Sequence, residues 1–326
     1  MKKLLKSTLI GLSALSLSFS SGCGLGFKKS KYISVIAGNQ SQQFMSAVEK
    51  GASDAAAEAG FKVIPYSSQR SLLEQISSVN DSIEKGVKCI IIDPIDVNAL
   101  DGVFEKAAEN HIRIITLGTE NAKRYSEHYR KNVTACVGTN YISTGAIAAR
   151  KAVSMIDSSS KVITVNSTVN DIPSNERVQG FEEQLLNNSG SDAMLLRSQY
   201  KGEDLVSIVE SIKNQILENT GVKLIFASNY NDTLCSCQAV EELSMTGKIF
   251  IIGCGYDEQL DKYIRSGTLS AVCVENPYNM GYLGVRFTKK LLDGTQVSVE
   301  NDTGISYVNA ENIDSEEVKL LLSQII

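Results

Sequence analysis

The stretch Lys88-Cys89-Ile90-Ile91-Ile92-Asp93-Pro94 decides the fold class. Its apolar residues stand in a row without alternation, which is typical of a strand that helices cover on both faces of a parallel sheet. Polarity returns at Asp93, and Pro94 has no N–H to donate to a neighbouring strand, so the strand must end there. In open α/β sheets ligands bind beyond the carboxyl ends of the strands. Asp93 is therefore the first candidate for a ligand contact.

Length and composition describe a soluble globular protein of two domains. The chain has 326 residues, of which 43% are hydrophobic and 21% charged, and a chain of this length exceeds one small core. The formal net charge is −5 and no block of like charges occurs. We therefore expect no nucleic-acid partner.

The first 23 residues form a predicted export signal. Lys2 and Lys6 precede an apolar run over residues 9–19, and small residues lead to Cys23. This arrangement resembles a bacterial lipoprotein signal, which implies lipidation of Cys23. Such signals usually carry Leu where this chain has Ser20, so plain secretion stays open. No later segment reaches about 18 apolar residues, and we expect an extracytoplasmic protein anchored to the cell membrane by lipid.

Cysteine and histidine usage predicts neither a disulfide framework nor a metal site. The chain has seven cysteines and two histidines, and no Cys-x-x-Cys motif. A chain of this size does not need disulfides for stability. Four cysteines fall in predicted buried strands, where the thiol acts as a small apolar group, and two fall on a predicted helix where they point in different directions. They are Cys89, Cys136, Cys254 and Cys273, and Cys235 and Cys237. We expect free structural thiols, and no metal or other cofactor.

Strand and helix patterns alternate in two matched series. This alternation with short links predicts βαβ units and parallel sheets. Strands are predicted to begin near Tyr32, Phe61, Val87, Ile112 and Val133, and near Lys161, Ala193, Val222, Lys248 and Leu269. After the fifth strand of each series, Asn140 and Gly145 have the same spacing as Asn276 and Gly281. Such a repeat predicts two similar α/β lobes.

The expected architecture is two doubly wound parallel-sheet lobes joined by a hinge. Residues 1–23 are the predicted signal and 24–30 a tether. The N-terminal lobe is predicted to comprise residues 31–139 and 276–297. The C-terminal lobe takes residues 140–275 and 298–326.

Catalytic motifs are missing from the sequence. It has no Gly-x-Ser-x-Gly elbow, no phosphate loop ending in Gly-Lys-Ser/Thr and no His-Glu-x-x-His. We therefore predict that the protein is not an enzyme, and turnover of a bound compound would revive that alternative. What stands at the strand ends instead is a set of polar and aromatic side chains, which suits a small polar ligand with CH-rich faces, such as a sugar.

The chain resembles the type I periplasmic binding proteins, particularly the ribose/galactose-type substrate-binding proteins of ABC importers. The resemblance runs from Lys31 to about Asn312. It rests on four segments in their order along the chain: Gly86–Pro94, Glu176–Phe181, Ala227–Asn229 and Thr303–Asn312. It implies that the protein closes on a sugar-like ligand and delivers it to a membrane permease.

The resemblance also implies roles for individual residues. Phe44 fits an aromatic that stacks on the ligand, Asp93 a hydroxyl acceptor, Arg177 a bidentate donor, Asn229 an amide contact and Glu275 a hinge-side contact. Gln42, Thr119 and Tyr256, which also follow predicted strands, complete the candidate set. Simpler alternatives stay open: a surface ion pair for Arg177, a helix cap for Asn229 and a core position for Phe44.

Two departures put ordinary sugar binding in doubt. Gly118-Thr119 stand where such sugar binders carry Asp-Arg, and Gly255 stands where they carry Asp. A site built to bind hydroxyl groups discriminates through such side chains. Fewer charges and more tyrosines suit a modified sugar, a nucleoside or another ligand with fewer hydroxyl groups.

The sequence thus predicts a monomeric, lipid-anchored solute-binding protein that serves an ABC transporter permease. The nearest alternative is a ligand-sensing lipoprotein that signals to a membrane receptor. A cytosolic sugar-responsive repressor is a further alternative, which the predicted signal peptide disfavours because it stands where such a repressor has its DNA-binding helices.

Overall fold

The computed structural model describes residues 31–118, 131–168, 171–187, 194–198 and 204–325. All of them belong to one compact unit, Lys31–Ile326. Thr119 and Cys23, two of the predicted functional residues, lie outside the described residues.

The first sheet has the strand order of a doubly wound fold. From edge to edge the order is β2-β1-β3-β4-β5-β11, and each neighbouring pair is parallel. Its strands are β1 (Tyr32–Ile36), β2 (Lys62–Tyr66), β3 (Cys89–Ile92), β4 (Arg113–Leu117), β5 (Ala135–Gly138) and β11 (Glu300–Asp302). The winding reverses between β1 and β3, so the ends of these two strands form the switch point where ligands bind in this class of sheet.

The second sheet repeats this order. It runs β7-β6-β8-β9-β10-β12, and only the edge strand β12 is antiparallel to its neighbour. Its strands are β6 (Lys161–Val165), β7 (Met194–Arg197), β8 (Val222–Ala227), β9 (Phe250–Cys254), β10 (Ala271–Val274) and β12 (Ser306–Asn309). The equivalent order confirms the predicted α/β fold class with two doubly wound sheets.

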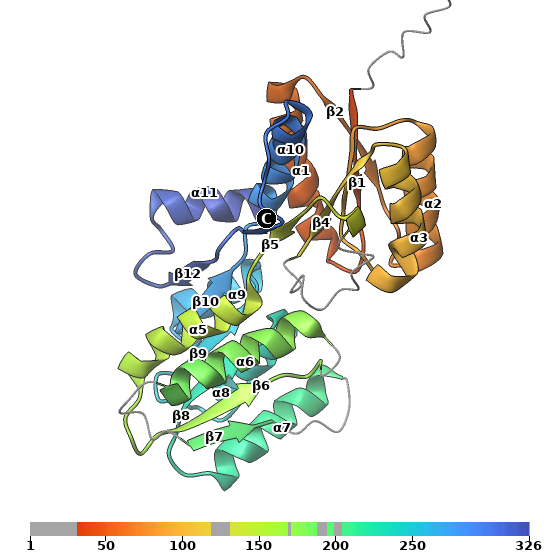
Figure 1. The fold of residues 1–326 in the computed structure, drawn as a ribbon. Helices are drawn as coiled ribbons and strands as arrows, with labels where there is room; N and C mark the ends of the chain where they lie inside the picture. The colour runs from red at the N-terminus through yellow and green to blue at the C-terminus, as the bar shows by residue number, and fades with distance from the viewer. Residues whose placement is uncertain (1–30, 119–130, 169–170, 188–193, 199–203, 326) are drawn as a thin grey trace, which may run out of the picture. The chain divides into compact units, whose positions relative to one another are not determined.

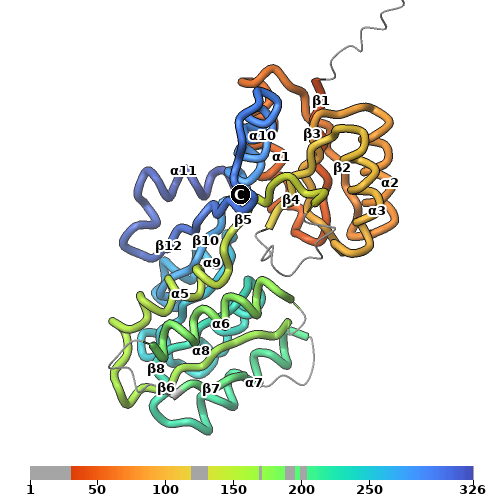
Figure 2. The backbone as a smooth tube through the Cα atoms, in the orientation of Figure 1, coloured from red at the N-terminus to blue at the C-terminus, as the bar shows by residue number. Residues whose placement is uncertain are grey.

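Helices cover both faces of the first sheet (Figures 1 and 2). They are α1 (Gln42–Ala59), α2 (Leu72–Glu84), α3 (Val97–Glu109) and α10 (Pro277–Leu292). Cys89 and Ile91 of β3 belong to the core beneath α1 and α10, whereas Ile90 and Ile92 belong to the core beneath α2 and α3. This two-sided burial explains why β3 is apolar at every position.

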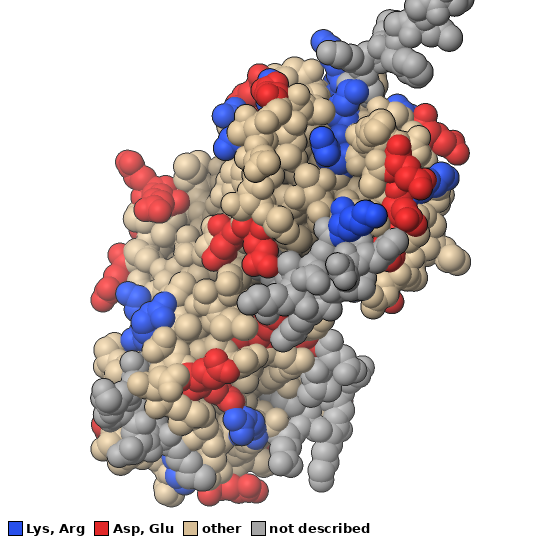
Figure 3. Space-filling view, viewed as in Figure 1, with Lys and Arg blue, Asp and Glu red and all other residues tan. Residues whose placement is uncertain are grey.

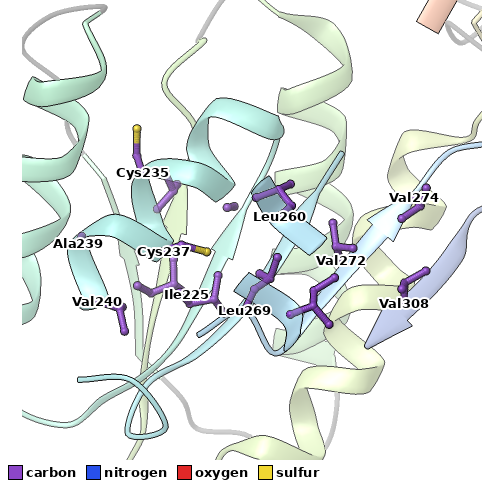
Figure 4. Packing of buried hydrophobic residues seen from close by; sticks show 14 of the residues in the cluster. Ile225, Cys235, Cys237, Ala239, Val240, Leu260, Leu269, Val272, Val274 and Val308 are labelled. Atoms are coloured by element: carbon purple, nitrogen blue, oxygen red, sulfur yellow. The ribbon is translucent and has the colours of Figure 1, made fainter. Parts of the chain in front are cut away.

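The second sheet is covered in the same way. Its helices are α5 (Tyr141–Ala152), followed by a short 3-10 turn (Val153–Met155), α6 (Ile172–Asn187), α7 (Leu205–Glu218), α8 (Tyr230–Glu242), α9 (Glu258–Ser266) and α11 (Glu316–Ile325). One core lies beneath α5 and α6, and the other beneath α7, α8, α9 and α11. In the second core the sulfur atoms of Cys235 and Cys237 point in different directions (Figure 4), as expected from their spacing. The six described cysteines are buried and form no disulfide with one another.

The repeated Asn residues begin equivalent helices. Asn140 Oδ1 accepts a hydrogen bond of 2.9 Å from Ser143 N at the start of α5. Asn276 Oδ1 accepts one of 2.8 Å from Asn279 N at the start of α10. Each side chain satisfies a backbone donor that the first helical turn leaves free.

The repeated Gly residues let two helices touch backbone to backbone. A Cβ atom at Gly145 of α5 would lie 1.9 Å from the carbonyl oxygen of Arg177 in α6. A Cβ atom at Gly281 of α10 would lie 1.9 Å from the carbonyl oxygen of Val48 in α1. Only glycine permits such an approach, so the matched Asn and Gly spacing marks one structural unit used twice.

The C-terminal crossing differs from the expected boundary. We expected residues 298–326 in the second lobe, but β11 pairs with β5 of the first sheet. Backbone hydrogen bonding therefore keeps the chain with the first sheet through Asp302, and β12 then joins the second sheet. The terminal helix α11 packs against α1 as well as within the second core.

The surface carries interspersed charge. On the face drawn in Figure 3, acidic and basic side chains alternate without a broad area of one sign. Among the helices of the described ranges, none combines the length and hydropathy needed to cross a bilayer.

Candidate functional site

A cavity of about 510 Å³ is lined by residues that follow strands of both sheets. Volumes of this size are typical of small-molecule sites. From the first sheet come residues between β1 and α1, and from the second come residues at the ends of β8, β9 and β10 together with helix starts. The lining includes Gln40, Ser41, Gln43, Phe44, Tyr141, Asp171, Pro173, Arg177, Asn229, Tyr230, Gly255, Tyr256, Asp257, Glu275, Pro277 and Ile325.

Arg177 is the cation of this lining. It lies on the first half of α6, is 9% exposed, and donates a 3.0 Å hydrogen bond to the carbonyl oxygen of Ser228. Its guanidinium also forms an ion pair with Glu275, which follows β10, and stacks 4.6 Å from the centre of the Tyr141 ring. The surface alternative for Arg177 is therefore wrong, because the side chain is buried at the cavity.

The environment of Arg177 keeps it charged. Burial is the largest single effect and disfavours the charged guanidinium, but the negative charge of Glu275, the hydrogen bond to it and neighbouring polar groups together raise the pKa of Arg177 above its usual value. Among the described residues, Arg177 Nε has no hydrogen-bond partner. A buried donor without a partner is costly, so the guanidinium has unused capacity for an acceptor.

Asn229 combines a lining position with a capping role. Its Oδ1 accepts a 3.0 Å hydrogen bond from Asp232 N and so caps α8. Its Nδ2 donates to Asp232 Oδ2 at 2.8 Å. Asp232 is fully buried, and this burial raises its pKa, while hydrogen bonds from neighbouring groups oppose the rise. The helix-cap alternative for Asn229 is confirmed, and the amide is already engaged by the fold.

Two tyrosines stand beside each other in the lining with different carboxylate partners. The hydroxyl of Tyr230 donates to Asp257 Oδ2 at 2.7 Å, and that of Tyr256 donates to Asp261 Oδ1 at 2.7 Å. Asp257 lines the cavity, whereas Asp261 does not. Burial and the neighbouring carboxylates raise the pKa of both phenols, which are therefore neutral hydrogen-bond donors.

Phe44 supplies an aromatic ring from the first sheet. It is half-buried, packs against the core beneath α1, and also lines the cavity. Ser41 Oγ fixes its backbone by accepting a 3.1 Å hydrogen bond from Phe44 N. The Phe44 ring therefore both packs against the core, as the simpler alternative expects, and borders the cavity, where a ligand could contact it.

Asp93 does not line this cavity. It is 8% exposed, and its Oδ2 accepts a 3.1 Å hydrogen bond from Gln40 N, which holds the loop after β1. Its carbonyl oxygen accepts a 2.7 Å hydrogen bond from Gln75 Nε2. The expectation that Asp93 accepts a hydrogen bond from a ligand hydroxyl therefore has no support in this geometry, because its side chain supports the loop that carries Gln40.

Gln42, another predicted ligand contact from the first sheet, also lies outside this cavity. Gln42 is exposed and lines two neighbouring hollows, whereas Gln40 and Gln43 reach the cavity. Gln42 is the first residue of α1. In the described ranges no group of three or more His, Cys, Asp or Glu could hold a metal ion.

Sequence reasoning did not single out Tyr141, Pro277 and Ile325. Tyr141 and Pro277 directly follow the repeated residues Asn140 and Asn276, so the repeat itself contained the signal that both crossings touch the cavity. Ile325 lies at the end of α11, and no pattern in the sequence connects it with the site.

Comparison with known proteins defines the class. A model of the periplasmic binding protein domain family matches residues 33–296. The chain therefore belongs to the periplasmic binding protein family.

Relatives are similar over almost their whole length. The ribose import binding protein of Haemophilus influenzae is 25% identical over 300 residues, covering 92% of this chain and 97% of the relative. The D-allose-binding periplasmic protein of Escherichia coli is 23% identical, with 87% and 89% covered. Among solved structures, a sugar-binding protein of a sugar ABC transporter from Bacillus halodurans matches with a TM-score of 0.77 and 23% identity, covering 87% of this chain and 99% of that one. An ABC transporter solute-binding protein of Agrobacterium vitis bound to α-D-tagatopyranose matches with a TM-score of 0.74 and 23% identity, with 89% and 98% covered.

Proposed function

We propose that this protein is an extracytoplasmic solute-binding protein that captures a small sugar-like ligand and delivers it to an ABC importer. The observation that carries the proposal is the cavity of about 510 Å³ at the ends of strands from two equivalent sheets. Family membership supports it, since the curated relatives are named for ribose import and allose binding. The same names favour import over the sensing alternative, and they name binding proteins rather than enzymes.

The proposed contacts are the predicted residues that line the cavity: Phe44, Arg177, Asn229, Tyr256 and Glu275. Arg177 carries spare hydrogen-bonding capacity through Nε, and Phe44 offers an aromatic face. Thr119 remains a proposed contact by its place after β4, and Asp93 and Gln42 act through the loop and helix that carry Gln40 and Gln43.

The proposed organisation keeps two lobes with a corrected crossing. Pairing of β11 with the first sheet and of β12 with the second supports a final crossing at residues 303–305. Binding between two lobes suits transport, because a ligand that touches both stabilises a closed form that the permease distinguishes from the empty protein. We further propose a monomer held at the membrane by a lipid on Cys23.

A thermal-shift screen of the purified mature chain against free sugars tests the proposal. Probes are D-ribose, D-allose, D-tagatose, D-fucose and D-arabinose, with deoxy sugars and nucleosides added. A ligand with a Kd 100-fold below its concentration should stabilise the fold by about 2.7 kcal/mol. If no probe changes the melting temperature, the proposed function is contradicted. Lipidation of Cys23 is tested separately by metabolic labelling with a fatty acid, which should label the wild-type protein but not Cys23→Ala.

A further inference from the structure

The acidic side chains of the cavity are engaged by the protein itself. Both carboxylate oxygens of Asp257 are used, because Oδ2 accepts from Tyr230 and Oδ1 accepts from two backbone amides at the start of α9. Glu275 is paired with Arg177. Asp171 Oδ2 accepts a 2.9 Å hydrogen bond from Ser174 N. Among the described lining residues, each carboxylate therefore already has a protein donor.

Tyr230 occupies the space beside Gly255. A Cβ atom at Gly255 would lie 3.0 Å from the Tyr230 Cβ, which is tighter than ordinary contact. Gly255 also has φ +93, a left-handed conformation that favours glycine. An acidic side chain at position 255 is thus incompatible with Tyr230 in its present place, so the wall here is aromatic rather than acidic.

Apart from Arg177 Nε, the described lining residues that the protein itself does not engage are aromatic and neutral. Phe44 comes from the first sheet, and Tyr230 and Tyr256 come from the second. The neutral polar groups beside them are the carboxamides of Gln40 and Gln43. Aromatic faces bind rings through their apolar faces, whereas each ligand hydroxyl buried without an acceptor costs free energy.

We propose that this cavity selects an uncharged ring compound with an apolar face and few hydroxyl groups, and disfavours the fully hydroxylated pentoses and hexoses. This inference rests on the proposed function and narrows its ligand class. Two sources share the chemistry: a deoxy sugar, or a nucleoside whose base presents the ring. Tyr230 is the specificity-determining residue, since its hydroxyl donates to the oxygen of Asp257 that does not cap a helix and so competes with a ligand hydroxyl for it.

Titration calorimetry with matched probe pairs tests the inference. The pairs are D-ribose and 2-deoxy-D-ribose, D-galactose and D-fucose, and uridine and 2′-deoxyuridine, and the members of each pair differ by one hydroxyl. The tightest probe should be a deoxy member that binds about tenfold more tightly than its partner. A best binder among the sugar pairs indicates a deoxy sugar, and one in the uridine pair indicates a nucleoside.

Tyr230→Phe sharpens the test because it keeps the ring and releases Asp257 Oδ2. The preference for the deoxy member should then fall by about tenfold, since a free carboxylate can accept from the added hydroxyl. Tyr282→Phe is the matched control. Tyr282 lies on α10, and its hydroxyl donates a 2.8 Å hydrogen bond to Glu58 Oε2. Neither residue lines the cavity, so Tyr282→Phe should keep the wild-type preference for the deoxy member.

The outcomes separate the two levels of the proposal. If D-ribose or D-galactose binds as tightly as its deoxy counterpart, or more tightly, the selectivity is overturned while solute binding stands. An unchanged preference in Tyr230→Phe overturns the role of Tyr230. If none of the six probes or the screened sugars binds, solute binding itself fails.

Discussion

The strand ends of the two sheets put their polar side chains to different uses. Beyond β3 of the first sheet, Asp93 turns its carboxylate to Gln40 N and so shapes the loop after β1. Beyond β10 of the second sheet, Glu275 meets Arg177 at the cavity. The topology is the same in both sheets. What differs is whether a backbone donor from an adjacent loop already binds the side chain, so a polar residue at a strand end is free to contact a ligand only where no such donor does.

The helix pairs that repeat in both halves should be the most sensitive positions. Gly145→Ala and Gly281→Ala each drive a Cβ into a carbonyl oxygen at 1.9 Å, and each should lower the free energy of unfolding by about 3 kcal/mol. Gly102→Ala in α3 is the matched control, because a Cβ there meets nothing within 4 Å. It should stabilise the protein by about 0.5–1 kcal/mol. Urea denaturation measures all three, and equal effects of the three variants would refute the equivalence of the helix pairs.

Breaking the ion pair between Arg177 and Glu275 in the second sheet should have the next largest effect on stability. Glu275→Gln leaves the buried guanidinium of Arg177 without its counter-charge, and the free energy of unfolding should fall by about 2–3 kcal/mol. Asp314→Asn is the control, since its partner Arg265 is 47% exposed at the side chain and exposed pairs contribute little. A Glu275→Gln variant as stable as wild type would show that Arg177 finds another partner.

The carboxylate of the first sheet should have a smaller effect on stability. Asp93→Ala removes the acceptor of Gln40 N, and the expected loss is about 1–1.5 kcal/mol. Asp93→Asn keeps a side-chain oxygen that can accept the same hydrogen bond, so it should recover part of this loss. Thermal denaturation of both variants checks the order, and an asparagine variant less stable than the alanine variant would argue against the loop-holding role.

The buried thiols of the two sheets should differ slightly in reactivity. Burial raises the pKa of Cys89 in β3 to about 12. In the second sheet a hydrogen bond from the Cys273 thiol lowers the pKa of Cys254; burial opposes this and the charge of Arg177 supports it. At pH 8 slow alkylation of the native protein, followed by peptide mass spectrometry, should modify Cys254 before Cys89. If Cys89 is modified before Cys254, the predicted order of thiol reactivity is wrong.

Much of the fold could be predicted from the sequence, because apolar runs and helical periods directly express burial. The strands β1, β6 and β8 begin at Tyr32, Lys161 and Val222, the residues that their patterns predict. The short edge strand β11 could not be found, since its three residues are polar and two of them are exposed. Pairing with β5, which is distant in sequence, is what makes it a strand.

The candidate site was predicted in part. Strand-end position and family resemblance led to Arg177, Asn229, Tyr256 and Glu275, which line the cavity. They could not reveal that Asp93 is held by Gln40 N or that Asn229 caps α8, because such hydrogen bonds depend on loop geometry rather than on residue type. Tyr230 directly follows Asn229 in the sequence, but its pairing with Asp257 and its contact with Gly255 emerge only from the fold.

The most direct measurement compares Arg177→Ala with Asp93→Ala by titration calorimetry against the tightest ligand of the wild-type protein. Circular dichroism first establishes that both variants are folded. If Arg177→Ala is not folded, Arg177→Lys replaces it in the comparison. We predict that loss of Arg177 weakens binding by about 100-fold, whereas loss of Asp93 weakens it by less than about tenfold through the displaced loop. A larger loss of affinity in Asp93→Ala than in Arg177→Ala would contradict the division of roles between the two sheets.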